Sequence, residues 1–215
     1  MTMLHYDHIC VVLDASGSMG PYEDDTIGNL EAFIKDQQKL KERKCTFSLY
    51  TFNNEVRKRT SFVNLQNIVF PKVGEVWGQK SEYIFFPSYK CELNTALRDA
   101  VGTAIDETGK TLSILKEEER PSTVIFVIQT DGIENWSKKY SAEQIREKVT
   151  LQKEVYNWQF IFMGSGGDTW LQAEKMGIVG INTMSVEYRQ SDKENTKNTY
   201  SSISDSIIIT RSKKH

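Results

Sequence analysis

The sequence has 215 residues, with 27 Lys and Arg against 29 Asp and Glu, which gives a formal net charge of −2. This length suffices for one domain with a substantial core, and the near-neutral charge gives no general attraction to nucleic acid or to anionic membranes. No apolar stretch approaches the roughly 18 residues that indicate a membrane-spanning helix, so we expect neither a nucleic-acid nor a membrane partner.

The first strongly patterned stretch is the apolar run at residues 9–13, which is rich in β-branched residues and predicts a buried strand. It ends in Asp14, Ser16 and Ser18. Pro21 and an amphipathic stretch follow, so these three side chains lie in a strand-to-helix loop, where ligands bind in open α/β sheets. Oxygen donors without nitrogen or sulfur ligands suit a hard cation such as Mg²⁺, Mn²⁺ or Ca²⁺. The alternative is an Asp/Ser turn that only caps the next helix.

Three elements are predicted after this loop. Helical spacing of apolar residues predicts a helix over residues 21–41, and alternation predicts a strand over residues 45–52. An Asn-Asn turn then leads to a hairpin partner at residues 56–62. Residues 63–89 are the least regular segment and are rich in aromatic residues. We favour a loop packed by its own aromatic side chains over a binding loop, but it is also the best candidate for partner specificity.

The second half of the chain alternates between helices and strands. Helices are predicted at residues 97–112, after the capping box of Ser141 and Gln144, at 168–176 and at 200–211, and strands at 123–128, 158–163 and 177–182. The glycine cluster at 164–167 is not a dinucleotide site, because Thr169 stands where the third glycine belongs. The alternation predicts an α/β fold with a mainly parallel central sheet and helices on both faces.

We expect a single domain over residues 1–215, with its core at about residues 5–185. Residues 186–215 are predicted to be a polar connection, a C-terminal helix anchored by Ile203, Ile207 and Ile208, and a frayed tail.

The three cysteines, Cys10, Cys45 and Cys91, are an odd number, and two of them lie in predicted strands. Buried free thiols are therefore expected. The first residues run into the first strand without an apolar signal region, which favours a cytoplasmic location.

Asp-x-Ser-x-Ser after a hydrophobic first strand resembles the metal-ion-dependent adhesion site (MIDAS) of von Willebrand factor A (vWA) domains. Thr95, in Leu-Asn-Thr-Ala-Leu, looks like the threonine of that site, although Asn94 replaces the glycine often found before it. Asp131, in Thr-Asp-Gly-Ile-Glu-Asn, looks like its second aspartate. The resemblance covers about residues 1–180 and is to cytosolic bacterial and phage members. It implies a Rossmann-like, doubly wound sheet in which the hairpin forms one antiparallel edge strand.

The resemblance also implies the roles of five side chains. Ser16, Ser18 and Thr95 coordinate the ion directly or in exchange with water, while Asp14 and Asp131 act partly through water. The open position of the ion then favours a carboxylate from a partner protein. The predicted function is a divalent-metal-dependent protein-interaction module that binds an Asp or Glu of its partner, with Mg²⁺ as the expected ion and Mn²⁺ or Ca²⁺ as alternatives. The sequence leaves the oligomeric state open.

We expect nearby loops to build the rim of this partner-binding surface. The candidate rim residues are Met19, Tyr22, Trp77, Tyr89, Glu134 and Trp136. For Glu134 the alternative is a solvated loop acid.

The alternative function is a metal-dependent phosphohydrolase that uses Asp14 as its nucleophile. Phosphatases that form an aspartyl phosphate need a second acid two residues later as general acid, and Ser16 stands there instead. We also find no Gly-x-Ser-x-Gly elbow and no Cys/His pair with an orienting acid. We therefore expect no catalytic residues.

Overall fold

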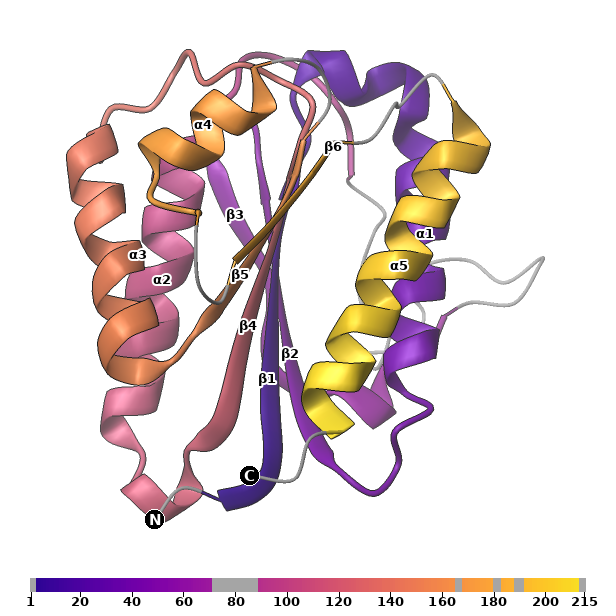
Figure 1. The fold of residues 1–215 in the computed structure, drawn as a ribbon. Helices are drawn as coiled ribbons and strands as arrows, with labels where there is room; N and C mark the ends of the chain where they lie inside the picture. Colours follow the sequence, from indigo (N-terminus) through magenta and orange to yellow (C-terminus); the bar gives the residue numbers. More distant parts are fainter. Residues whose placement is uncertain (1–2, 71–88, 165–167, 180–182, 188–191, 213–215) are drawn as a thin grey trace.

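The computed structural model describes residues 3–70, 89–164, 168–179, 183–187 and 192–212. Its six-stranded sheet has the order β3-β2-β1-β4-β5-β6. The strands are β1 (Met3–Asp14), β2 (Lys44–Phe52), β3 (Val56–Asn64), β4 (Pro121–Thr130), β5 (Gln159–Gly164) and β6 (Thr183–Glu187). The helices are α1 (Glu23–Gln37), α2 (Leu97–Ile114), α3 (Ala142–Tyr156), α4 (Thr169–Lys175) and α5 (Lys193–Ser212). Figure 1 shows α1 and α5 on one face of the sheet and α2, α3 and α4 on the other.

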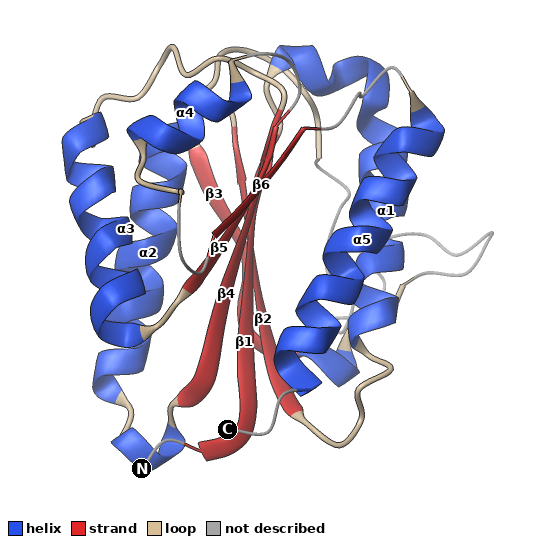
Figure 2. Cartoon of the chain, in the orientation of Figure 1, coloured by secondary structure: helices blue, strands red, loops and turns tan. Residues whose placement is uncertain are grey.

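The strand pairing confirms the predicted fold class. β1 pairs in parallel with both β2 and β4, and β5 extends the parallel sheet from β4 to β6. Only β3, at the edge, runs antiparallel to its described neighbour, as the hairpin predicted (Figure 2). Because β1 and β4 are neighbours, the loops at their carboxyl ends lie side by side.

Alternation along β1 divides the core into two layers. Ile9, Val11 and Leu13 pack toward α1 and α5, while Cys10 and Val12 pack toward α2, α3 and α4. β4 is buried on both faces, as expected of a central strand in a parallel sheet. Cys10 and Cys45 are buried free thiols, as predicted, whereas Cys91 is a free thiol that is only half-buried.

The C-terminal region differs from the prediction. The last described strand is Thr183–Glu187, and residues 177–179, the described part of the predicted strand at 177–182, form no strand. Gly177 has a φ of +73° and the Ile178 amide donates to the carbonyl of Ala173, so the apolar residues there close the end of α4. α5 begins at Lys193, well before residue 200, because Asp192 accepts a hydrogen bond from the Asn195 amide (3.0 Å) and so caps the helix.

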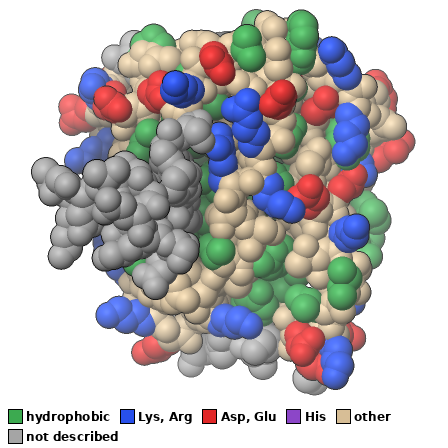
Figure 3. Space-filling model, turned by 180° about the vertical axis from the view of Figure 1, so that it is seen from behind, with side chains coloured by type: hydrophobic (Ala, Val, Ile, Leu, Met, Phe, Trp, Pro, Cys, Tyr) green, Lys and Arg blue, Asp and Glu red, His purple; other side chains and the backbone are tan. Residues whose placement is uncertain are grey.

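Of the three predicted anchors of the last helix, Ile203 and Ile207 are buried and Ile208 is half-buried. No described helix is long and apolar enough to cross a membrane. On the face drawn in Figure 3, Lys and Arg side chains are interspersed with Asp and Glu over much of the surface that grey atoms do not cover. This distribution agrees with the near-neutral charge of the chain.

Gly102 allows α2 to pack closely against the start of α3. A Cβ at this position would lie 2.6 Å from Tyr140 Cδ2 and 2.8 Å from Ile145 Cδ1, whereas a Cβ at Gly109, on the same helix, would meet nothing within 4 Å. We expect Gly102→Ala to lower the free energy of unfolding by about 1–2 kcal/mol, because overpacking outweighs the gain in helix propensity. The matched Gly109→Ala should raise it by up to about 1 kcal/mol. Urea denaturation of both variants tests this, and equal effects would contradict the packing argument.

Candidate metal centre

Asp14 ends β1, and its carboxylate is fixed from two sides. Its Oδ1 accepts a hydrogen bond from the Ser16 amide (2.7 Å), and its Oδ2 accepts one from the Thr130 hydroxyl (2.5 Å) at the end of β4. The side chain is fully buried. The last residues of two neighbouring parallel strands therefore hold this carboxylate in one orientation.

The loop after Asp14 carries the two serines to the second carboxylate. The chain enters a 3₁₀ helix at Gly17–Tyr22, and this tight winding brings Ser16 Oγ within 3.2 Å of Ser18 Oγ. The Ser18 hydroxyl donates to Asp131 Oδ1 at 2.6 Å. Ser16 is buried and Ser18 is exposed, so the cluster opens to solvent on the Ser18 side.

Thr95 reaches the same place from a third loop. A Cβ on Gly132 would lie 2.7 Å from Thr95 Oγ1 and 3.5 Å from Asp14 Oδ2, so both groups border the space beside the Gly132 backbone. The Thr95 amide donates to Asn135 Oδ1 (2.9 Å), and the Asn135 amide donates back to the Thr95 carbonyl (3.1 Å). The five predicted donors, Asp14, Ser16, Ser18, Thr95 and Asp131, thus lie around one position at the carboxyl end of the sheet.

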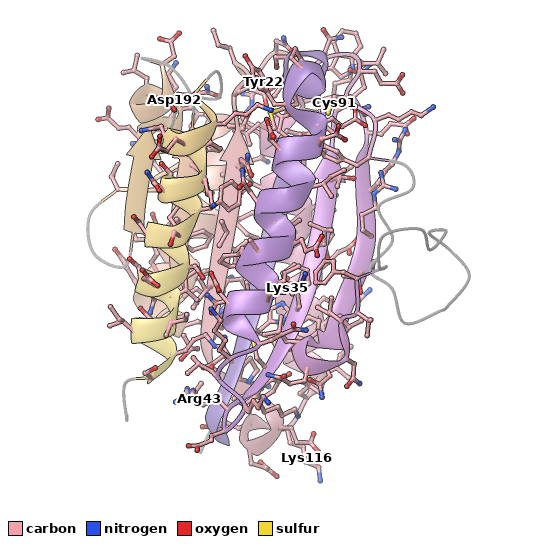
Figure 4. All side chains as sticks on the ribbon, turned by 90° about the vertical axis from the view of Figure 1, so that its right-hand side faces the viewer. Tyr22, Lys35, Arg43, Cys91, Lys116 and Asp192 are labelled. Atoms are coloured by element: carbon pink, nitrogen blue, oxygen red, sulfur yellow. The ribbon has the colours of Figure 1, made fainter. Side chains whose placement is uncertain are left out.

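Backbone hydrogen bonds dock the Thr95 loop onto the Asp14 loop. The Gly17 amide donates to the Leu93 carbonyl (3.1 Å), and the Glu92 amide donates to the Ala15 carbonyl (3.0 Å). Figure 4 shows Tyr22, from the first loop, and Cys91, from the second, at the same end of the molecule. Because these hydrogen bonds join backbone atoms, the two loops are held together before any ligand binds.

Both carboxylates sit where a negative charge is unfavourable. Burial raises the pKa of Asp14 to about 6, although hydrogen bonds from Thr130 and Ser16 oppose this shift and the charge of Asp131 adds to it. Burial also raises the pKa of Asp131 above its ordinary value, against the hydrogen bond from Ser18. A nearby divalent cation would remove both penalties.

The donor set suits a hard divalent cation, since all its atoms are oxygens. Gly132 lets the backbone of its loop approach the Thr95 hydroxyl and the Asp14 carboxylate closely, because a Cβ there would lie only 2.7 Å from Thr95 Oγ1. The described residues contain no group of three or more His, Cys, Asp or Glu placed to hold a metal. The candidate centre therefore depends on its hydroxyl donors as much as on its two acids.

The predicted rim needs correction at three positions. Met19 and Tyr89 are buried, which places both side chains beneath the surface. The Tyr89 hydroxyl instead donates a hydrogen bond to the Asp14 carbonyl (2.5 Å) and so stabilises the loop that carries Ser16 and Ser18. Glu134 organises its own loop, because its carboxylate accepts from the amides of Ser137 (2.8 Å) and Arg98 (2.9 Å). It is neither a free rim carboxylate nor a solvated acid.

The other rim predictions have different outcomes. Trp136 is exposed and Tyr22 is half-buried, so both remain candidates for partner contact. Trp77 lies outside the described residues. Sequence reasoning also missed Thr130 and Asn135 as supports of the site. A signal existed for Thr130, because it ends β4 beside the end of β1 in the predicted parallel pair.

No protein-family model and no curated protein sequence matches this chain. Solved structures do match. The vWF domain of the type V pili tip protein Mfa5 from Porphyromonas gingivalis superposes with a TM-score of 0.66 at 10% identity, over 100% of this chain and 99% of that one. The von Willebrand factor type A structure from Catenulispora acidiphila matches with a TM-score of 0.57 at 10% identity, over 92% of this chain and 42% of that one. The chain has the von Willebrand factor A fold.

A third match is the PilB minor pilin from Streptococcus sanguinis, with a TM-score of 0.66 at 13% identity. It covers 96% of this chain, which spans only 62% of PilB. At these identities the matches establish the vWA fold and not a shared activity. The fold confirms the expected architecture.

Proposed function

We propose that this protein is a divalent-metal-dependent interaction module that binds an acidic group of a partner protein. The observation that supports this function is the convergence of two carboxylates and three hydroxyls from three loops, described above. Mg²⁺ is the proposed ion, with Mn²⁺ or Ca²⁺ as alternatives.

The charge balance of the site supports an acidic ligand. Two carboxylates match the charge of a divalent ion without exceeding it, and both already accept hydrogen bonds from Ser16, Ser18 and Thr130. A carboxylate from a partner can therefore replace a water on the ion without meeting a site of net negative charge. Ser18 lies on the exposed side of the cluster, from which a partner would approach.

The named neighbours support an interaction role, since Mfa5 is a pilus tip protein and PilB is a minor pilin. No described contact favours the phosphohydrolase alternative. Asp14 is buried and both of its carboxylate oxygens are hydrogen-bonded, whereas a nucleophile needs an open approach.

The first half of the test measures the metal. In chelator-stripped protein we expect Mg²⁺ to raise the melting temperature, because the ion binds the folded state; at a hundred times the dissociation constant linkage gives about 2.7 kcal/mol. Thr95→Ala should require at least about tenfold more Mg²⁺ for the same shift. Thr123→Ala is the matched control, because Thr123 is equally buried at the start of β4 and should respond as the wild type does. No response to any of the three ions at millimolar concentration would contradict the site.

The second half of the same test measures the partner. Capture of a partner protein should be lost on adding EDTA and on Thr95→Ala, and kept in Thr123→Ala. Equal capture with and without EDTA would place the interface elsewhere.

A further inference from the structure

Large apolar side chains are exposed in two of the loops that form the candidate metal centre. Leu93 and Ile133 are each 60% exposed, and Trp136 is 39% exposed. Leu93 lies two residues before Thr95. Ile133 follows Gly132, where an added Cβ would contact the Thr95 hydroxyl. The Trp136 amide donates a hydrogen bond to the Thr95 carbonyl (3.2 Å). All three residues therefore lie on backbone segments next to Thr95, one of the candidate metal ligands.

Leu93 combines an exposed side chain with a strained backbone. Its φ is +69°, in the left-handed region that leucine rarely adopts, and its carbonyl accepts the hydrogen bond from Gly17 that docks the two site loops. Such a conformation is destabilising for leucine. A strained leucine that stays in solvent gains little from folding, so its apolar side chain is better explained by a contact made outside the chain.

The loop that carries Ile133 and Trp136 is also fixed. Glu134 accepts hydrogen bonds from the amides of Trp136 (3.0 Å) and Ser137 (2.8 Å). Asp99, on α2, accepts three more from the amides of residues 138–140, at 2.9 to 3.0 Å. Because the backbone is ordered before binding, a ligand that covers these side chains loses less entropy in ordering them.

We propose that Leu93, Ile133 and Trp136 form an apolar subsite beside the metal, which selects partner segments with a large apolar residue two positions from the metal-binding Asp or Glu. The inference rests on the proposed function, because the carboxylate on the ion holds the segment in place. Leu93 is two residues from Thr95, a span of at most about 7 Å. In an extended segment, side chains two positions apart point to the same face and are also separated by about 7 Å. The ion supplies the charge complementarity, and the subsite covers the neighbouring apolar side chain.

Selection from a displayed library of random nine-residue peptides tests the subsite. The full chain is immobilised in Mg²⁺, and bound peptides are eluted with EDTA and sequenced. We expect enrichment of Asp or Glu, together with Leu, Ile, Phe or Trp two positions away. The selection is then repeated on Leu93→Asn and on Ile133→Ser. Asn tolerates the left-handed backbone but lacks the apolar side chain. On both variants the acidic residue should remain enriched, while the preference for an apolar residue disappears. A peptide selected on the wild type should bind each variant about tenfold more weakly, which corresponds to about 1.4 kcal/mol.

Leu151→Ser is the control, because Leu151 is also exposed (50%) but lies on α3, away from the metal loops, and should bind as the wild type does. Acidic peptides without an apolar preference, or a preference that both variants retain, would overturn the subsite and leave the metal-dependent function standing. If EDTA elutes no acid-enriched peptides from the wild type, the proposed function and the subsite both fail. Two variants in separate loops guard against a folding defect in either one.

Discussion

Asp7→Ala should lower the free energy of unfolding by about 3–5 kcal/mol, one of the largest effects expected in this protein. Asp7 is fully buried in β1 and forms ion pairs with Arg43 (2.7 Å) and Arg211 (3.0 Å). Arg211, near the end of α5, is itself fully buried and also donates to the carbonyl (3.1 Å) and side-chain oxygen (2.8 Å) of Gln37. Removal of this carboxylate would break both ion pairs and leave the fully buried Arg211 guanidinium without its counterion among the described residues.

A matched control separates this buried network from ordinary ion pairing. Lys193 also ties α5 to α1, through Asp25 at 2.9 Å, but its side chain is mostly exposed. Lys193→Ala should therefore cost less than about 1 kcal/mol. Urea denaturation measures both variants. If Asp7→Ala is as mild as Lys193→Ala, the network does not hold α5 on the sheet.

Below about pH 6.5, the wild type should lose stability faster than His8→Phe does. His8 is fully buried in β1, where its ring stacks on Phe62 with centroids 3.9 Å apart. Its Nδ1 lies 2.9 Å from the Thr46 hydroxyl, and its Nε2 has no hydrogen-bond partner among the described residues. Burial lowers the pKa of His8 to about 3, because the charged ring would be desolvated.

The sign follows from proton binding in the two states. The unfolded chain protonates His8 near pH 6.5, whereas the folded chain does so only near pH 3. Between these values the unfolded state binds more protons, so the free energy of unfolding falls by about 1.4 kcal/mol for each pH unit of acidification. By pH 4 this amounts to about 3 kcal/mol relative to neutral pH.

Urea denaturation from pH 8 to pH 4 compares the two proteins. His8→Phe keeps an aromatic ring against Phe62 but binds no proton. The curves should be parallel above about pH 6.5 and diverge below it. The raised pKa of Asp14 acts in the opposite direction, but it is present in both proteins and cancels in the difference. Parallel curves down to pH 4 would contradict a neutral buried His8.

Local sequence patterns determined most of the architecture and much of the candidate site. The apolar runs of β1 and β4 and their strand-to-helix loops predicted the parallel sheet. The Ser141 capping box is present, with the Gln144 amide donating to Ser141 Oγ (3.2 Å) and the Ser141 amide donating to Gln144 Oε1 (2.9 Å). Asp14, Ser16 and Ser18 were recognisable because they are close neighbours in one loop. Such features depend on groups a few positions apart, where the backbone period alone sets the geometry.

Only the tertiary structure decided which distant groups meet. The pairing of Asp7 with Arg211 joins residues 204 positions apart, and the hydrogen bond from Thr130 to Asp14 joins residues 116 positions apart. The burial of Tyr89 against the Asp14 carbonyl likewise depends on how loops distant in the sequence pack together, and the periodicity of the sequence does not predict such packing. The sequence does not show whether a polar side chain is solvated or buried. Its role is settled by the partner that packing brings to it, because a buried charge or donor without a partner destabilises the fold.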